Sequence, residues 1–178
     1  PPRSTLFPYT TLFRSLTSKT IQRYLRYFEL SYQAIVLPAW SKNPGKRLTK
    51  MPKIHYMDNG VVQAVLQKKG GITGGEFESL VIAEIHKQIA TISAQVQTYH
   101  LRTYDGKEVD LLIEMPDHYL AFEIKKADRI TAHDARNLMG LEDLLNKPLK
   151  KAFILSNDRD TKVFNDKIIA ISTTMFLG

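Results

Sequence analysis

Acidic and basic side chains gather in one stretch of the sequence, residues 104–126. Two apolar runs there flank Met-Pro-Asp-His, an arrangement that predicts a β-hairpin with its loop at these residues. Pairing Glu114 with Tyr119 across the loop places Asp110 opposite Glu123, and directly opposed Cβ atoms lie about 5 Å apart. The sequence therefore predicts two neighbouring carboxylates on adjacent strands.

The side chains of this hairpin should alternate between the two faces of a sheet. Asp110 is then expected on one face, with Val109 and Leu111 on the other. On the second strand, Glu123 shares a face with Lys125. The lysine would stand about 7 Å along the strand from the acid, within reach of a group bound there.

Two carboxylates held this close repel each other unless a cation lies between them. Hard oxygen ligands favour Mg²⁺ or Mn²⁺ over softer metals, so the pair predicts a divalent-cation site. The ordinary alternative for the tripeptide from Glu123 to Lys125 is a solvated ion pair on an exposed strand.

A third carboxylate favours the cation site. Residues 76–92 have a helical pattern in which Glu78 falls within an apolar stripe. A carboxylate that points toward a core needs a partner, because a buried unpaired charge is costly. The stripe consists of Val81, Ile82, Ile85, Ile89 and Ile92.

The order of an acid on a helix, then Asp, then Glu-x-Lys resembles the PD-(D/E)xK nuclease superfamily. A closer resemblance, to domain of unknown function 4143, rests on three segments and covers nearly all of residues 16–178. The segments are Gly-Gly-Glu-Phe-Glu-Ser-Leu-Val (74–81), Leu-Arg-Thr-Tyr-Asp-Gly-Lys-Glu-Val-Asp (101–110) and Phe-Glu-Ile-Lys (122–125).

This resemblance implies a nuclease-like fold in the C-terminal part of an AAA+ type ATP-binding protein of bacteria or archaea. Carried over by position, it implies that Glu78, Asp110 and Glu123 bind the metal and that Lys125 is the catalytic lysine. Nuclease-like domains often keep their fold for binding alone, so cleavage and binding both stay open.

Residues 1–15 resemble translated sequencing adapter rather than part of a fold. Thr-Leu-Phe occurs there at 5–7 and again at 11–13, in a run rich in Ser, Thr and Pro that lacks an initiator Met. A cleaved signal peptide is the alternative, but an uninterrupted apolar core and a cleavage pattern are missing. We therefore expect the native N-terminus to be missing and the sequence to be a fragment.

Composition limits the chemistry that these residues can perform. The sequence contains no Cys, which excludes disulfides, zinc-thiolate sites and thiol nucleophiles, and a reducing cytoplasm is the simplest setting. No apolar run approaches the length of a membrane span. A Gly-rich phosphate loop of the Walker type is also absent, so this chain does not bind ATP by that route.

Positive charge is concentrated near the N-terminus, since residues 16–60 have a net charge of +6 and residues 61–178 one of −1. This asymmetry suggests a phosphate-bearing partner, although a solvated basic surface explains the charge equally well. A helix capped by Ser18 over residues 18–30, followed by a hairpin within 34–56, is typical of the end of a winged-helix module. Its candidate DNA-contacting residues are Lys19, Arg23, Arg26, Lys46 and Arg47.

The remaining elements predict an α+β fold, with a mixed sheet flanked by helices. A short helix over 60–68, capped by Asp58, should lead through a Gly-rich hinge into the nuclease-like unit. After the helix of Glu78 we expect a strand over 95–103, the central hairpin, a helix over 132–146, and strands over 152–155 and 168–172.

Several other polar residues receive lower weight. Arg102 could hold a substrate phosphate, but a salt bridge to Glu108 or Asp105 is the commoner fate. Trp40 is expected in the core. The histidines show no pair at metal-ligand spacing and are expected to be structural or on the surface; they are His55, His86, His100, His118 and His133.

The sequence thus divides into a non-native segment (1–15), a partial winged-helix-like basic module (16–70) and a PD-(D/E)xK nuclease-like domain (71–178). One function is Mg²⁺-dependent phosphodiester cleavage of DNA. The alternative is a catalytically silent module that contacts DNA or protein and regulates or targets the missing ATPase.

Overall fold

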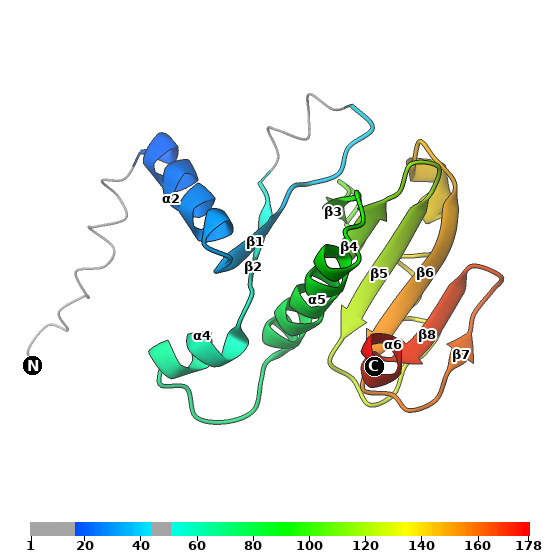
Figure 1. Ribbon diagram of the computed structural model, residues 1–178. Coiled ribbons are helices and arrows are strands. Elements are labelled where there is room, and N and C mark those ends of the chain that lie inside the picture. Colours follow the sequence, from blue (N-terminus) through cyan, green and yellow to red (C-terminus); the bar gives the residue numbers. More distant parts are fainter. Residues whose placement is uncertain (1–16, 44–50) are drawn as a thin grey trace, which may run out of the picture.

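The computed structural model describes residues 17–43 and 51–178 (Figure 1). A helix and strand region precedes a six-stranded mixed sheet flanked by helices, which confirms the predicted α+β class. The candidate residues Lys46 and Arg47 and the segment 1–15 lie outside the described residues.

Helix α2 (Ser18–Leu30) coincides with the predicted first helix. Its N-cap is Thr17, whose hydroxyl oxygen accepts a hydrogen bond from the Thr20 N–H at 3.2 Å, so the predicted cap at Ser18 is wrong by one residue. No residue of α2 is buried, although the helix has a clear apolar stripe.

The predicted N-terminal hairpin is present as β1 (Ala34–Leu37) and β2 (Lys53–Tyr56), which pair antiparallel. Helix α4 (Asn59–Val65) follows. As predicted, the Asp58 side chain caps this helix by accepting hydrogen bonds from two N–H groups of its first turn.

The large sheet has the strand order β3-β4-β5-β6-β8-β7. Its first three strands are antiparallel, β6 and β8 run parallel to β5, and β7 pairs antiparallel with β8. The parallel pairs require a crossover after β5 and another after β6. The strands are β3 (Gln97–Arg102), β4 (Glu108–Glu114), β5 (Tyr119–Lys125), β6 (Leu149–Ser156), β7 (Lys162–Val163) and β8 (Ile168–Ser172).

Helix α5 (Gly74–Thr91) covers one face of this sheet, and helix α6 (Thr173–Leu177) packs beside it (Figure 1). A capping box between Thr73 and Glu76 begins α5 and fixes its first turn. The apolar stripe packs against the inner residues of β4 and β5. The predicted stripe is wrong at its last residue, Ile92, because this residue lies beyond the helix and is 73% exposed.

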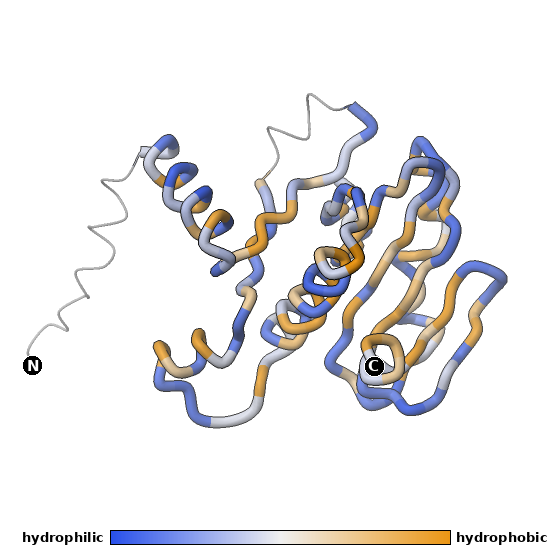
Figure 2. Tube along the Cα trace, in the orientation of Figure 1, coloured by the Kyte–Doolittle hydropathy of each residue, from blue (hydrophilic) through white to orange (hydrophobic). Residues whose placement is uncertain are grey.

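The other face of the sheet is covered by turns rather than by the helix predicted over 132–146. Residues 132–140 form successive turns, and only Leu141–Leu144 form a 3₁₀-helix. Gly140, with φ of 62°, separates the two parts and interrupts helical geometry. Orange stretches in Figure 2 mark the hydrophobic residues along the strands of the large sheet. The apolar residues of the turns nevertheless reach the core; the buried ones are Ala135, Leu138, Leu141 and Leu145.

The central hairpin has the predicted register, with Glu114 opposite Tyr119 and the ladder extending to Leu111 opposite Phe122. Strict alternation fails beyond that point. Val109 packs on the face opposite to Leu111, because a register shift in the β3–β4 pairing interrupts the period between them. The expected grouping of Val109 with Leu111 is therefore wrong, and Asp110 lies within the irregular step.

Candidate functional site

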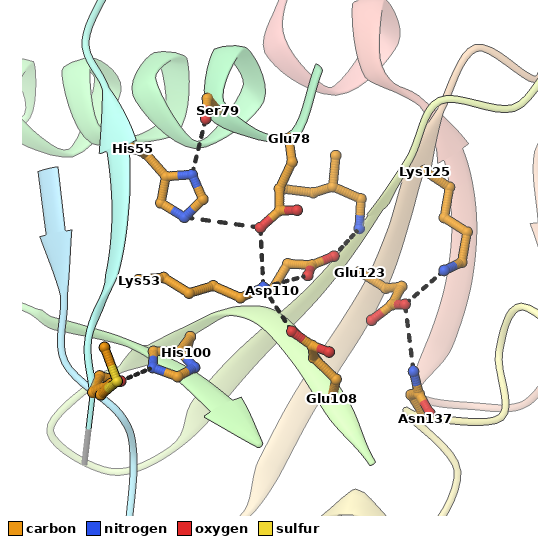
Figure 3. A network of polar contacts seen from close by, with 12 residues as sticks. Lys53, His55, Glu78, Ser79, His100, Glu108, Asp110, Glu123, Lys125 and Asn137 are labelled. Atoms are coloured by element: carbon orange, nitrogen blue, oxygen red, sulfur yellow. Dashed lines mark hydrogen bonds and ion pairs between the residues drawn. The ribbon is translucent and has the colours of Figure 1, made fainter. Parts of the chain in front are cut away.

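The residues predicted to perform chemistry meet where α5, β4 and β5 lie side by side (Figure 3). Glu78 comes from the second turn of α5, and Asp110 from the start of β4. Glu123 and Lys125 come from the end of β5. The structure therefore brings together four residues from three elements.

Glu123 is 4% exposed, and only one of its two carboxylate oxygens has hydrogen-bond partners. Oε1 accepts from the Lys125 ammonium at 2.8 Å and from the Asn137 amide at 3.5 Å, whereas the buried Oε2 accepts from no group. Burial, and then the nearby charge of Asp110, raise the pKa of Glu123 to about 7. An ionised Glu123 is thus short of positive partners.

Asp110 links the two sides of the site. Its Oδ2 accepts the backbone N–H of Ile124 at 2.9 Å, which ties the start of β4 to the end of β5 beyond the regular ladder. Its Oδ1 accepts from the ammonium of Lys53 at 3.1 Å. With 7% of its surface exposed, Asp110 depends on these donors.

Lys53, at the start of β2, lies at the centre of the acidic cluster (Figure 3). Its Nζ is 3.1 Å from Glu78 Oε1, 2.9 Å from Glu108 Oε1 and 3.1 Å from Asp110 Oδ1. Burial alone would lower the pKa of Lys53, but Asp110, Glu108 and Glu78 together raise it above its usual value. The ammonium therefore stays charged and neutralises part of the cluster.

Glu78 has to share its contact with the Lys53 ammonium with two other carboxylates. Burial and the Asp110 charge raise the pKa of Glu78, and the contact with Lys53 offsets part of that rise. The neighbouring His55 stays neutral near pH 7, because burial and then Lys53 lower the pKa of its imidazole to about 4. His55 Nδ1 lies 3.1 Å from the Ser79 hydroxyl, which links β2 to α5.

A hollow of about 400 Å³ opens beside the cluster, at the start of β4. Arg102 lines it together with Lys53, His100 and the fully exposed Tyr104. Arg102 is opposite Glu108 in the β3–β4 pairing and contributes to lowering the pKa of that acid, after Lys53. The position suits a contact with a phosphate next to the acids, the role considered for Arg102 from the sequence.

The donor set matches a hard divalent cation in type but not in its present placement. All the acids offer oxygen, and one oxygen each of Glu78 and Asp110 already share a single cationic group, the Lys53 ammonium. Within residues 17–43 and 51–178, however, no three acidic or histidine side chains are arranged to hold a metal ion. Lys53 occupies the place where the oxygens of Glu78 and Asp110 converge.

Helix α2, which carries three of the candidate basic residues, lies away from α5 and the large sheet in Figure 1. Lys19, Arg23 and Arg26 are exposed, and Arg26 makes a loose contact of 3.8 Å with Glu29.

The sequence does not single out Lys53, Glu108 or Asn137 as members of the site. Lys53 falls within the predicted hairpin over 34–56, and a lysine in such a position usually points to solvent. Its partners lie 25 and 57 positions away for Glu78 and Asp110, so no local spacing connects them. Asn137 falls in the segment for which a helix is wrongly predicted.

The sequence profile of the domain of unknown function DUF4143 matches residues 73–176, which is more than half of the chain. The chain belongs to this family. A second profile, that of the domain of unknown function DUF8612, matches residues 3–70. The first range begins at Thr73, the cap of α5, so the DUF4143 range holds the predicted acids and Lys125, whereas Lys53 comes from the DUF8612 range.

Two curated proteins of mycobacteria are similar to this DUF4143 chain, and both are described as uncharacterized. The proteins, from Mycobacterium bovis and Mycobacterium tuberculosis, are each 31% identical to it over 132 residues, which is 68% of this chain. The matched part spans only 29% of the length of either relative. No helix in the described part of this chain is long and apolar enough to cross a membrane.

Proposed function

We propose that residues 73–176 form a PD-(D/E)xK nuclease-like domain that cleaves phosphodiester bonds of DNA with the help of Mg²⁺ or Mn²⁺. The observation that carries the proposal is the buried Glu123 carboxylate, one oxygen of which has no partner although Asp110 lies beside it. A core acid that serves stability alone normally has its oxygens satisfied. A divalent cation is the ligand that would satisfy this pair.

Asp110, Glu123 and Glu78 are the residues that would hold the ion. When bound, it would supply Lewis-acid activation of a phosphate and of an attacking water. Lys125, whose ammonium already lies against Glu123, would steady the negative charge of the phosphate. Arg102, at the adjacent hollow, would bind a neighbouring phosphate of the same strand.

The mycobacterial relatives are more than three times as long as the part matched here. We propose that this domain is the C-terminal part of a longer AAA+ type ATP-binding protein. The ATPase would then move or position DNA while the domain described here acts on it.

Mn²⁺ titration of the chain tests the metal site. The wild type should bind one ion that Asp110→Asn does not bind, because this substitution keeps the shape of the side chain but removes the charge that the cation needs. Asp166→Asn, the same substitution at an exposed residue outside the cluster, serves as the control and should bind the ion as the wild type does. Equal binding by the wild type and Asp110→Asn would rule out the proposed site.

A nicking assay on supercoiled DNA then separates cleavage from binding. Lys125→Met should retain Mn²⁺ binding and lose Mg²⁺-dependent nicking, since the lysine contacts the phosphate rather than the ion. A wild type that binds Mn²⁺ and never nicks DNA would leave the site in place and remove the nuclease activity.

A second candidate function, a catalytically silent interaction module, is favoured by α2. The helix exposes both its basic residues and its aromatic side chains, including Tyr24 and Tyr27. If α2 contacts DNA, replacing Arg23 and Arg26 together by Ala should lower the slope of log affinity against log salt by about two. The matched double variant Arg129→Ala and Arg159→Ala should leave the slope unchanged, because these exposed arginines belong to the charge-balanced part of the chain.

A further inference from the structure

The three-way contact of Lys53 differs from the other lysine contacts of the described chain. Its Nζ lies within 3.1 Å of oxygens from three carboxylates, and its side chain is 25% exposed. Lys147, of similar exposure at 29%, pairs with the single carboxylate of Glu114 at 2.9 Å. The ammonium lies between three carboxylates, which is the position that a divalent cation occupies in an oxygen-lined metal site.

Lys53 belongs to a different element from the three acids. Lys53 lies in β2, which is within the range matched by the DUF8612 profile, whereas Glu78, Glu108 and Asp110 lie within the DUF4143 range. Strand β2 pairs with β1 and touches α5 through His55 and Ser79. Strand β2 is held in place, since its partner β1 buries Leu37 in the same cluster as α5 and the segment after β1 is bonded to the His100 carbonyl of β3. The ammonium can leave the cluster through a change in the partly exposed Lys53 side chain, without any change in the large sheet.

An ammonium and a metal ion cannot share these oxygens. Mg²⁺ needs ligand oxygens at about 2.1 Å, whereas the Lys53 ammonium holds the oxygens of Glu78 and Asp110 at 3.1 Å each. Two cations between the same oxygens would also repel each other strongly in a partly buried site. Occupation by one must exclude the other.

We infer that the Lys53 ammonium competes with a divalent cation for Glu78 and Asp110, so that this side chain blocks the metal site until it moves away. The inference rests on the proposed metal-binding function. While its ammonium lies between Glu78 and Asp110, Lys53 neutralises these acids and keeps the cation out. When a cation replaces the ammonium, Glu108 remains available to pair with Lys53, because Glu108 is not among the proposed ligands.

Mn²⁺ titration of the 178-residue chain and two lysine variants tests the competition. Lys53→Met should bind Mn²⁺ about tenfold more tightly than the wild type, a coupling typical of two ligands that exclude each other. Lys147→Met, the matched control, should bind as the wild type does, because it releases an acid outside the cluster.

The outcomes of this titration separate the two proposals. Equal Mn²⁺ affinity in the wild type and Lys53→Met would overturn the competition and leave the metal site intact. Absence of binding in both would overturn the metal site and the competition together.

Chemical labelling of the wild type provides a measurement that does not depend on the folding of Lys53→Met. Reductive methylation followed by mass spectrometry should show Lys53 protected without metal and labelled faster with saturating Mn²⁺. Lys87, which pairs with Glu84 on the exposed face of α5, is the internal reference and should not change. Unchanged labelling of Lys53 at saturating Mn²⁺ would overturn the competition.

Discussion

Helices α2 and α5 have apolar residues at helical spacing, yet they differ completely in what they bury. Helix α5 buries five residues against the sheet, whereas α2 buries none. Beside α2 and α4 lies an open groove of about 630 Å³, lined by Leu25, Phe28, Tyr32, Ile54, Val61 and Val65 among others. An apolar stripe therefore predicts which face of a helix can be buried, while the presence of a partner element decides whether that face is buried.

The same contrast explains why the site is built on the sheet. A catalytic or binding side chain keeps its position only when packed elements on both sides fix it. Asp110 and Glu123 stand between two clusters of buried residues, whereas Arg23 and Arg26 project from a helix without a buried residue. The packed sheet fixes the positions of its acidic side chains, whereas the arginines of α2 are free of such packing.

Matched Leu→Ala substitutions give the largest expected difference between the regions. Leu112→Ala, at a fully buried position of β4, should cost about 2–5 kcal/mol of unfolding free energy because it leaves a cavity. Leu30→Ala, at a position of α2 that is 61% exposed, should change stability by about 0.5 kcal/mol or less. Urea unfolding followed by circular dichroism measures both, and equal costs would contradict the described difference in packing.

Much of the fold could be predicted from local patterns. The register of the central hairpin, the bounds of α2 and the cap of α4 follow from short-range turn and capping chemistry. The error over residues 132–146 arose because an apolar residue every three or four positions also suits successive turns that face a core. Periodicity indicates burial there, but it does not fix the hydrogen-bond pattern.

The candidate site could be predicted where its members belong to one motif or, as for Glu78, where an acid falls within an apolar stripe. Glu123 and Lys125 are two positions apart, and hairpin pairing connects them to Asp110. Lys53 joins them through tertiary packing of a separate strand, and no spacing in the sequence encodes that contact. The lysine could have been suspected only from the general need of a buried acid such as Glu78 for a positive partner.

Neutralising either of two buried acids, Asp158 and Glu123, should change the Tm in opposite directions. Asp158 accepts from Lys162 and from the N–H groups of Ile130 and Asp160, and these contacts lower its pKa to about 2. Its folded pKa lies below the unfolded value, so its stabilisation is present at neutral pH and is lost as pH falls through about 2. Asp158→Asn should therefore lower the Tm at pH 7 by a few degrees, with a smaller effect in acid.

Glu123→Gln should not destabilise the metal-free protein. The pKa of Glu123 is raised to about 7, so the ionised form disfavours the folded state increasingly as pH rises from the usual carboxyl range through 7. Gln keeps the oxygen that accepts from Lys125 and removes the charge. Thermal unfolding at pH 5 and pH 8 should show the gain of Glu123→Gln over the wild type only at the higher pH. A loss of Tm at pH 8 similar to that of Asp158→Asn would assign Glu123 a structural role.

Trp40 tests where the N-terminal region ends and the domain of the large sheet begins. It lies in the N-terminal half of the chain, yet its ring is buried in the core of the large sheet and its indole N–H donates to the Tyr119 hydroxyl at 3.1 Å. Its backbone N–H donates to the His100 carbonyl at 2.7 Å, which attaches this segment to β3. The unit that unfolds together should therefore extend N-terminal of residue 70.

Trp40→Phe should cost about 1–2 kcal/mol, because it removes one buried hydrogen bond and part of a packed ring. Trp40 is the only Trp of the sequence, so its fluorescence in the wild type reports on this position alone. The fluorescence transition in urea should coincide with the circular dichroism transition of the sheet, and Trp40→Phe should shift the latter to lower urea. If Trp40 fluorescence changed at lower urea than the sheet signal and Trp40→Phe left the sheet transition in place, the segment 38–40 would belong to the N-terminal region. Strand β2, which carries Lys53, would then lack this attachment to the domain whose acids Lys53 neutralises.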